Sequence, residues 1–232
     1  MNETLTVFIP AYNESANLEG CVQALQEKLV ALGVEAEILI VDDGSQDGSG
    51  ALADALAARW SNLRVIHHPA NRGIGAAFVT AVSAALGEWL ILIPADLAMD
   101  LDDLPRYLEA AHQADIVVGL RSDRSDYTWI RRLISWVNIR LVQVLFGMSL
   151  RQFQYISLYR TPVLRQIEIE YWQSAFFLAE ILIKARDQGF RLVEVEVRYL
   201  PRRAGRATGV RPRLILRTLL DLFHYFWVRQ RR

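Results

Sequence analysis

Carboxylates follow two apolar runs of this chain, and they are the residues whose type and position could do chemistry. Ile38–Val41 runs directly into Asp42–Asp43, and Trp89–Ile93 is followed shortly by Asp96. Short apolar runs bounded by turn residues are typical of strands that are buried on both faces of a parallel sheet. Ligands of such sheets lie just beyond the carboxyl ends of the strands. A carboxylate at this edge could bind a metal ion, bind a ribose or act as a base.

The elements that must position these carboxylates alternate between strand and helix. Ser15 is the expected N-cap of the first helix, and Gly33 is its expected C-terminal stop. Strict alternation with short connections predicts an α/β fold with a right-handed, mostly parallel sheet. We expect strands at 4–9, 36–42, 63–67, 88–94 and 115–119, and helices at 15–32, 46–59, 75–86 and 102–113.

The pattern changes after residue 121, although 232 residues with 52% hydrophobic side chains still fit one large domain with a well-filled core. An apolar helix with interspersed arginines is expected at 129–146. It is followed by a strand at 153–160, a helix at 175–188, a strand at 191–199, a basic loop at 201–213 and a final helix at 214–228.

The net charge of zero conceals two halves of opposite sign. Residues 1–120 contain 5 Lys and Arg against 17 Asp and Glu, whereas residues 121–232 contain 21 against 9. One explanation is drift on a solvated surface. The other is a division of labour, with acids for a metal and a base in one half and arginines for phosphates or anionic lipid in the other. Nucleic acid is not expected as a partner, because no recognised binding module accompanies the arginines.

Cysteine content and hydropathy exclude several classes of protein. The single cysteine, Cys21, excludes an internal disulfide framework, fits a reducing compartment and is expected to pack inertly within a helix. The N-terminus has no basic region followed by an apolar one, so no secretory signal is expected. No run reaches the roughly 18 uncharged residues of a membrane span.

Three motifs together resemble the family-two nucleotide-sugar glycosyltransferases. They are Pro10–Glu14 after the first strand, Val41–Ser45 after the second and Ala95–Asp96 after the fourth. The nearer match is the branch of dolichol-phosphate mannose synthase and the bacterial polyprenyl-phosphate glycosyltransferases. The resemblance continues through Asn71–Ala77 and Val118–Arg121 and then, more weakly, to about residue 210.

The resemblance implies a single glycosyltransferase-A-type (Rossmann-like) α/β domain at 1–210, followed by a basic amphipathic helix at 211–232. It implies inverting transfer of a sugar from a nucleoside-diphosphate sugar to a polyprenyl phosphate, with Mg²⁺ or Mn²⁺ as cofactor. Such a reaction needs stabilisation of the charge that develops on the departing nucleoside diphosphate.

Site residues follow from the same resemblance, position by position. Asp96 is the expected metal ligand, and Arg121 and Arg202 are expected near phosphates. Glu180 lies on the helix under the active site. Nucleotide-sugar binding is expected at Pro10, Tyr12, Glu14, Val41, Asp43 and Ala95, catalytic roles at Asp96, Arg121, Glu180 and Arg202, and acceptor binding at Arg151 and Ser157.

The chain departs from the family pattern near the expected chemistry. Pro94 replaces the first acid of the Asp-x-Asp metal motif, while Arg151 and Ser157 replace an acidic and a basic residue of the acceptor segment. The basic loop has Ala207–Thr208 where relatives carry Ser-Lys. One hypothesis is an active enzyme with a rearranged acceptor site. The alternatives are a transferase with a non-lipid acceptor and a degenerate, non-catalytic partner subunit.

Three further motifs have structural interpretations. His67–His68 has no partner at metal-ligand spacing, so a structural role is expected. Gly73 and Gly75 are too few for a phosphate-binding fingerprint and are expected to pack a helix under the nucleotide. An ordinary Asx turn is the alternative interpretation of Asp42–Ser45.

The last helix poses the question of the membrane. Arg217, Asp221 and His224 share one face, and the rest of 214–228 is largely Leu, Phe, Tyr and Trp. We expect it to lie in the interface of a membrane surface, with the helix at 129–146 as a second contact. The alternative is a helix folded back on the catalytic domain or on a second subunit, and a homo-oligomer is left open. The expected location is cytoplasmic, peripheral at the inner face of the cell membrane.

Overall fold

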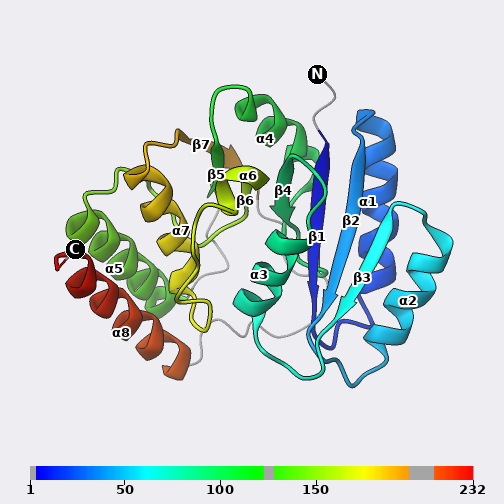
Figure 1. Ribbon diagram of the computed structural model, residues 1–232, viewed down its shortest axis with the longest axis horizontal. Coiled ribbons are helices and arrows are strands. Elements are labelled where there is room, and N and C mark those ends of the chain that lie inside the picture. The colour runs from blue at the N-terminus through cyan, green and yellow to red at the C-terminus, as the bar shows by residue number, and fades with distance from the viewer. Residues whose placement is uncertain (1–3, 123–127, 199–211, 232) are drawn as a thin grey trace.

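The computed structural model describes residues 4–122, 128–198 and 212–231. Its centre is a seven-stranded sheet in the order β3-β2-β1-β4-β6-β5-β7 (Figure 1). The strands are β1 (Leu5–Ala11), β2 (Ala36–Asp42), β3 (Leu63–His67), β4 (Trp89–Leu92), β5 (Ile116–Arg121), β6 (Ser157–Arg160) and β7 (Leu192–Val197).

Six of these strands run in one direction, and β6 is antiparallel to both of its neighbours, β4 and β5. The expected mostly parallel α/β sheet is therefore confirmed. In the register of the sheet Ala11 pairs with Asp42, and Asp42 pairs with His67. The carboxyl ends of β1, β2 and β3 thus meet at one edge.

Helices cover both faces of the sheet. Successive residues of a strand point to opposite sides, so the apolar strands have side chains to bury on each face. Val7, Ile9 and Ile38 belong to a core with α1, α2 and α4. Phe8 and Leu39 belong to a second core with α3, α5, α7 and α8. The helices are α1 (Leu18–Leu32), α2 (Ser49–Arg59), α3 (Ile74–Ala84), α4 (Leu104–Ala111), α5 (Trp129–Phe146), α6 (Thr161–Leu164), α7 (Phe176–Asp187) and α8 (Pro212–Arg229), with a 3₁₀ turn, η1, at Leu101–Asp103.

Two local expectations need correction. The first helix begins at Leu18 with Asn17 in the cap position, and Ser15 does not cap it. The backbone N–H of Ser15 is instead bonded to Asp47 of the neighbouring loop. The strand expected at 153–160 is limited to Ser157–Arg160, because the preceding residues leave the sheet. Gly33 does end α1, with φ of 62°.

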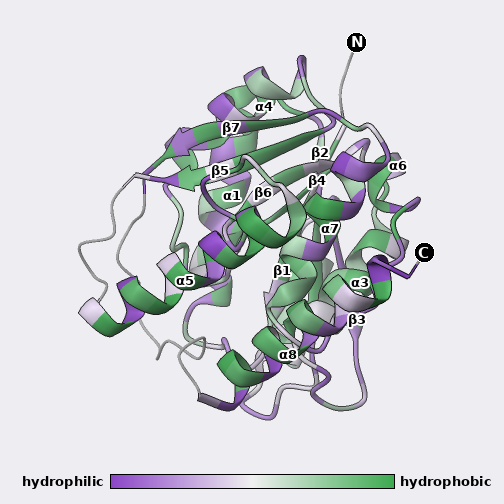
Figure 2. Cartoon of the chain, turned by 90° about the vertical axis from the view of Figure 1, so that its left-hand side faces the viewer, coloured by the Kyte–Doolittle hydropathy of each residue, from purple (hydrophilic) through white to green (hydrophobic). Residues whose placement is uncertain are grey.

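The C-terminal helix α8 is folded back on the domain, where it contacts α5 and α7. Its inner side buries Thr218, Leu222 and Tyr225. Its outer side leaves Leu216, Leu220, Phe223 and Trp227 exposed, and α5 exposes Trp129, Ile130, Leu133, Trp136, Val137 and Val144. We call these ten side chains the α5–α8 apolar surface. The apolar residues of both helices are visible in Figure 2. Within the described ranges no helix has the length and hydropathy needed to cross a bilayer.

Candidate active site

Three loops meet at the carboxyl edge of the sheet, and they carry most of the residues expected to do chemistry. The loop after β1 holds Tyr12 and Glu14, the loop after β2 begins with Asp43, and the turn after β4 holds Asp96. Backbone bonds extend the sheet into these loops, since Asp43 N donates to Ala11 O at 2.8 Å and Ile93 N donates to Phe8 O at 2.9 Å. The structure thus brings together the three motifs that the sequence separates.

The loops after β1 and β2 are joined by side-chain hydrogen bonds. Asn13, which has φ of 57°, accepts from Gln46 N at 2.9 Å and donates its own N–H to Ser45 Oγ at 3.0 Å. Glu14 N donates to Ser49 Oγ at 2.8 Å. Tyr12 stays 46% exposed beside this junction, so its ring is available to a ligand. Pro10 is paired with the buried Val41 across the two strands, and Ala95 after β4 is also buried.

Asp42 bonds within its own loop, but not in the way that the alternative interpretation of this motif predicts. Its Oδ1 accepts from Ser45 N at 3.0 Å, three residues on, whereas an Asx turn spans two. Its Oδ2 lies 2.9 Å from His67 Nδ1, and His67 Nε2 lies 3.0 Å from Asp54 Oδ1. Burial alone would raise the pKa of Asp42, but the hydrogen bonds from Ser45 and His67 outweigh it and lower that pKa. Its bonds to Asp42 and then to Asp54 raise the pKa of His67.

Asp43 does something different from its neighbour. Its carboxylate accepts from Arg72 N at 2.9 Å and Gly73 N at 2.7 Å, and Oδ1 lies 2.7 Å from His68 Nδ1. The expected structural role of both histidines is confirmed, because each binds one aspartate of the motif. Gly44 lets this loop close, since a Cβ there would lie 2.6 Å from the backbone of Ala70.

Asp96 lies in a sharp turn after β4 and is partly buried. Its Oδ1 accepts from Ala98 N at 3.2 Å, and Leu97 between them has φ of 49°, which a bulky residue rarely adopts. Cys21 packs beneath, with Sγ 3.9 Å from Pro94 O. Burial, with a smaller contribution from the charge of Asp96, raises the pKa of Cys21 to about 12. The thiol therefore stays protonated at neutral pH, as expected for inert packing.

The described residues fit a divalent cation only if the substrate supplies most of the ligands. They contain no group of three or more His, Cys, Asp or Glu side chains placed to hold a metal. Mg²⁺ is nevertheless commonly bound through one or two carboxylates, several waters and the phosphates of a substrate. Asp96 at the carboxyl edge of the sheet fits that type of donor set, in which the nucleotide supplies the other ligands.

Arg121 ends β5 and is only 5% exposed. Its backbone N–H donates to Gln152 Oε1 at 3.1 Å, so the segment that precedes β6 fixes its main chain. Arg202, the other arginine expected near phosphates, lies outside the described residues, as does the boundary between 210 and 211.

Glu180 has a supporting position, and the expectation of a catalytic role is corrected accordingly. The side chain is fully buried on α7, where its carboxylate accepts from Glu170 N, Tyr171 N and Lys184 Nζ at 2.9, 3.0 and 2.7 Å. Burial raises its pKa despite the bond from Lys184. Glu180 therefore fixes the loop at 169–173.

The two expected acceptor residues are also placed differently. Ser157 is 2% exposed within β6, so the sheet closes it off from an acceptor. Arg151 is exposed, but Glu194 Oε2 lies 3.0 Å from its Nε and Glu196 Oε1 lies 3.6 Å from its Nη1. The guanidinium of Arg151 is thus paired with two acids on β7.

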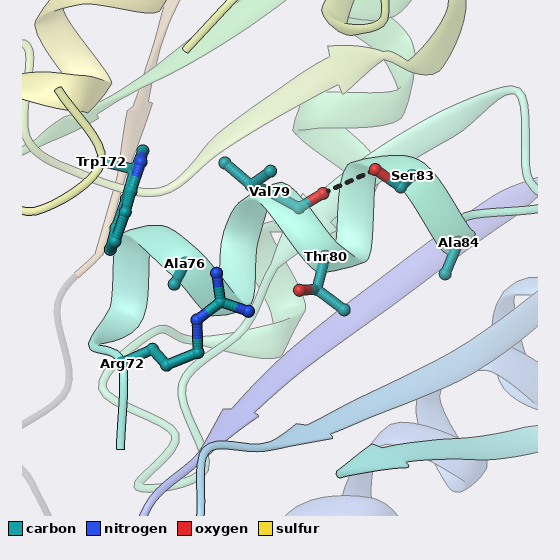
Figure 3. A pocket seen from close by; sticks show the side chains of 7 residues that line it. All are labelled: Arg72, Ala76, Val79, Thr80, Ser83, Ala84 and Trp172. Carbon is teal, nitrogen blue, oxygen red and sulfur yellow. Dashed lines mark hydrogen bonds between the residues drawn. The ribbon is translucent and has the colours of Figure 1, made fainter. Parts of the chain in front are cut away.

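A hollow of about 420 Å³ adjoins the loop that Asp43 holds (Figure 3). The guanidinium of Arg72 lies 5.9 Å from the ring centre of Trp172, and small side chains of α3 line the rest. Trp172 also packs against Gly75, where a Cβ would lie 1.9 Å from Trp172 O. Gly75 thus packs the helix, as expected. Sequence reasoning missed Trp172, because nothing local in 169–173 indicates contact with α3.

Comparison with known proteins identifies relatives of the whole described domain. Residues 6–175 match the family described as glycosyl transferase family 2. An undecaprenyl-phosphate mannosyltransferase of Micrococcus luteus is 29% identical over 207 residues, which are 85% of this chain and 84% of that protein. An undecaprenyl-phosphate 4-deoxy-4-formamido-L-arabinose transferase of Aeromonas hydrophila is 32% identical over 88% of this chain, which spans 64% of that longer protein.

Solved structures share the fold at low identity. Glucosyl-3-phosphoglycerate synthase from Mycobacterium tuberculosis, in complex with Mn²⁺, UDP-glucose and phosphoglyceric acid, has a TM-score of 0.73 at 16% identity and covers 97% of this chain and 80% of its own. A mannosyltransferase from Pyrobaculum calidifontis, in complex with GDP-mannose and Mn²⁺, has a TM-score of 0.66 at 18% identity over 89% of this chain and 59% of its own. The glycosyltransferase-A-type fold is thereby confirmed.

Proposed function

This chain belongs to glycosyl transferase family 2, and on that premise we propose that it transfers a sugar from a nucleoside-diphosphate sugar to a polyprenyl phosphate. The observation that carries the proposal is the assembly of Tyr12, Asp43 and Asp96 at one sheet edge, in a chain alignable over 85% of its length with an undecaprenyl-phosphate mannosyltransferase.

The nucleoside half of the donor binds beside β1 and β2. The exposed ring of Tyr12 offers a stacking surface, and the Arg72–Gly73 backbone held by Asp43 lies next to the anchored Glu14 loop. Pro10, Val41 and Ala95 form the floor beneath these groups. Open α/β sheets bind nucleotides at this edge.

The diphosphate half binds nearer β4 and β5. Asp96 would hold Mg²⁺ or Mn²⁺ together with phosphate oxygens, and such a cation would supply positive charge to the leaving group. Arg121, at the end of β5, and Arg202 bring further positive charge to the phosphates. Relatives by fold that contain Mn²⁺ and a nucleotide sugar support this use of a cation.

The transfer step requires positioning more than proton removal. An oxygen of the acceptor phosphate attacks the anomeric carbon, the bond from that carbon to the diphosphate breaks, and the nucleoside diphosphate departs with the bonding pair. Attack from the face opposite the leaving group inverts the anomeric carbon. A phosphate is already ionised at neutral pH, so no general base is needed.

Arg151 is the proposed contact for the acceptor phosphate. Its ion pairs with Glu194 and Glu196 are at a site where the arginine side chain is 59% exposed. Ion pairs of an exposed side chain are weak, so a doubly charged phosphate can displace them. Ser157 is buried within β6, so Arg151 is the more accessible of the two residues predicted for the acceptor.

Because the proposed acceptor is a lipid, the transfer reaction takes place at a membrane surface. The α5–α8 apolar surface includes three tryptophans, and arginines on the same helices can reach lipid phosphates. We propose that the protein docks peripherally on the cytoplasmic face of the membrane through this surface. Association of two copies through it is the competing arrangement, which would make a homo-oligomer.

One observation favours a second candidate function. Pro94 stands where relatives have the first metal-binding acid, which is the change expected in a non-catalytic partner subunit. A soluble acceptor is the remaining enzymatic alternative.

Nucleotide binding tests the enzyme hypotheses, because an enzyme must bind its donor, whereas a non-catalytic subunit need not. We expect UDP, GDP or a corresponding nucleotide sugar to raise the melting temperature in the presence of Mn²⁺. Asp96→Ala should remove the part of the effect that depends on Mn²⁺, and the metal-independent part should persist. A wild-type protein whose melting temperature no nucleoside diphosphate raises would refute the enzymatic function.

A further inference from the structure

The histidine pair at the end of β3 has one member that the proposed chemistry does not use. His68 has a side chain that is only 5% exposed, in contrast to 42% for His67. A buried imidazole must have its ring nitrogens bonded, since an unpaired buried polar group is costly. Both nitrogens of His68 are bonded, and the identity of the partners indicates a role.

His68 stands between two elements of the donor site. Its Nδ1 lies 2.7 Å from Asp43 Oδ1, and its Nε2 lies 2.9 Å from Thr80 Oγ1 on α3. Its backbone N–H donates to Asp42 O at 2.8 Å, which fixes the main chain of His68 to the end of β2. The ring is therefore held by β2, β3 and α3 together.

Asp43 passes this constraint to the start of α3. Its two carboxylate oxygens take the backbone N–H groups of Arg72 and Gly73, the last two residues before the helix. Gly73 has φ of 93°, a conformation that glycine adopts readily and other residues rarely adopt. The bonds form a closed ring that runs from Asp43 through His68 and Thr80, along α3, and back through Gly73.

The orientation of the Asp43 carboxylate depends on the buried histidine. A carboxylate can rotate about its terminal bond, and a rotation of about 90° would move its oxygens away from the two N–H groups that they meet. The bond from His68 is made to a charged acceptor in a buried site, where hydrogen bonds of this kind are the stronger ones. It selects the one rotation that suits both N–H groups.

We propose that His68 is a positioning residue for the donor nucleotide, acting through Asp43 on the Arg72–Gly73 turn. The inference rests on the proposed function, since it presumes that the turn meets the nucleoside. His68 itself touches no substrate. Because the nucleoside that the turn is proposed to meet does not react, loss of His68 removes binding that is equal in ground and transition states. Such a loss raises KM and leaves kcat unchanged.

Two near-isosteric substitutions test the inference. The amide nitrogen of Asn occupies roughly the place of Nδ1, so His68→Asn keeps the bond to Asp43 and loses the bond to Thr80. The longer Gln reaches the place of Nε2, so His68→Gln keeps Thr80 and loses Asp43. We expect His68→Gln to weaken nucleoside diphosphate binding about tenfold, which is about 1.4 kcal/mol. His68→Asn should stay within about threefold of wild type.

Two controls separate positioning from general destabilisation. Thr80→Val removes the other hydrogen bond and should affect the dissociation constant less than His68→Gln does. Amide hydrogen exchange at Arg72 and Gly73, measured without nucleotide, should be faster in His68→Gln than in His68→Asn, even where the two variants melt at the same temperature.

The outcomes are distinguishable. Wild-type binding with equal affinity in the Asn and Gln variants would overturn the inference about His68 and leave the proposed function standing. A wild-type protein that binds no nucleotide would overturn the proposed function and, with it, the role of His68 in donor binding. Weaker binding in His68→Gln alone, with faster exchange at the turn, supports both.

Discussion

At the scale of single residues, the two adjacent aspartates after β2 have separate tasks. Asp42 shapes its own loop through a bond from Ser45 N and pairs with His67, whereas Asp43 holds the Arg72–Gly73 turn and pairs with His68. The motif alone indicates nucleotide binding for the pair. The structure adds that each carboxylate is oriented by its own histidine from the neighbouring strand.

The His67 bridge predicts a pH-dependent contribution to stability. Bonds to Asp42 and Asp54 raise the pKa of His67 above its ordinary value of about 6.5. The contribution of His67 to the free energy of unfolding is therefore complete below that ordinary value, and it is lost as the pH rises through the raised pKa. His67→Gln should lower the melting temperature more at pH 5.5 than at pH 9, as measured by calorimetry. An equal decrease at both pH values would contradict a charged bridge.

The burial of Glu180 predicts a structural phenotype. Removing one partner of a buried ion pair typically costs about 3–5 kcal/mol, and Glu180→Gln also disturbs two bonds to backbone N–H groups. Urea unfolding should show a loss of this order. Glu109→Gln, on the exposed side of α4, is the matched control and should change the unfolding free energy by less than about 0.5 kcal/mol. Unchanged stability with abolished turnover would restore a direct catalytic role for Glu180.

At the scale of elements, the sheet edge and the start of α3 depend on contacts between segments far apart in the sequence. The Trp172 backbone packs directly on Gly75. Two further contacts hold the same loop: Glu180 on α7 accepts from Tyr171 N, and the Tyr171 hydroxyl lies 2.8 Å from His224 Nδ1 on α8. The loop at 169–173 therefore joins the C-terminal helix to the donor side of the molecule.

Gly75 offers a direct test of that packing. Gly75→Ala would place a Cβ 1.9 Å from Trp172 O, so the loop or the helix must shift. We expect a loss of about 1–3 kcal/mol in unfolding free energy together with weaker nucleotide binding. Gly20→Ala is the control, because nothing lies within 4 Å of a Cβ there, and it should gain about 0.5–1 kcal/mol. Similar effects of the two substitutions would show that α3 is not closely packed at Gly75.

The success of the sequence in predicting these elements varied with their locality. The strands at β1 to β4 and their helices follow from apolar runs and turn residues within each segment. β6 was predicted too long, because its four-residue antiparallel insertion between β4 and β5 depends on the rest of the sheet. The pairing of Asp42 with His67 depends on register between strands, and the position of Trp172 depends on tertiary packing. Neither leaves a local signal in the sequence. One clue was available, because the spacing from Asp42 to His67 equals that from Asp43 to His68.

At the scale of the whole molecule, the donor edge and the α5–α8 apolar surface belong to one domain. α8 buries Leu222 and Tyr225 in the same core as α3 and α7, so the expected interfacial helix is also folded back on the domain. The two alternatives for this helix are therefore compatible, since its inner side packs while its outer side stays apolar and exposed.

Membrane docking can be measured by flotation with vesicles that contain anionic lipid. Leu220→Ser with Trp227→Ser removes two exposed apolar side chains of α8 and should reduce binding at least about tenfold. Val30→Ser with Leu86→Ser, which are exposed outside this surface, should leave it unchanged. If the first pair instead converts a dimer to a monomer without changing flotation, the surface is an interface between two copies.

The central claim, transfer of a sugar to a lipid phosphate, is tested most directly by changing the acceptor. Wild-type protein is incubated with a radiolabelled nucleotide sugar that binds, Mn²⁺, and either polyprenyl phosphate or the matching polyprenol, and the label in the lipid phase is counted. We predict label in lipid with the phosphate only, and a loss of at least about 100-fold in Asp96→Ala. No label in lipid with any bound donor, or equal labelling of the polyprenol, would contradict transfer to a lipid phosphate.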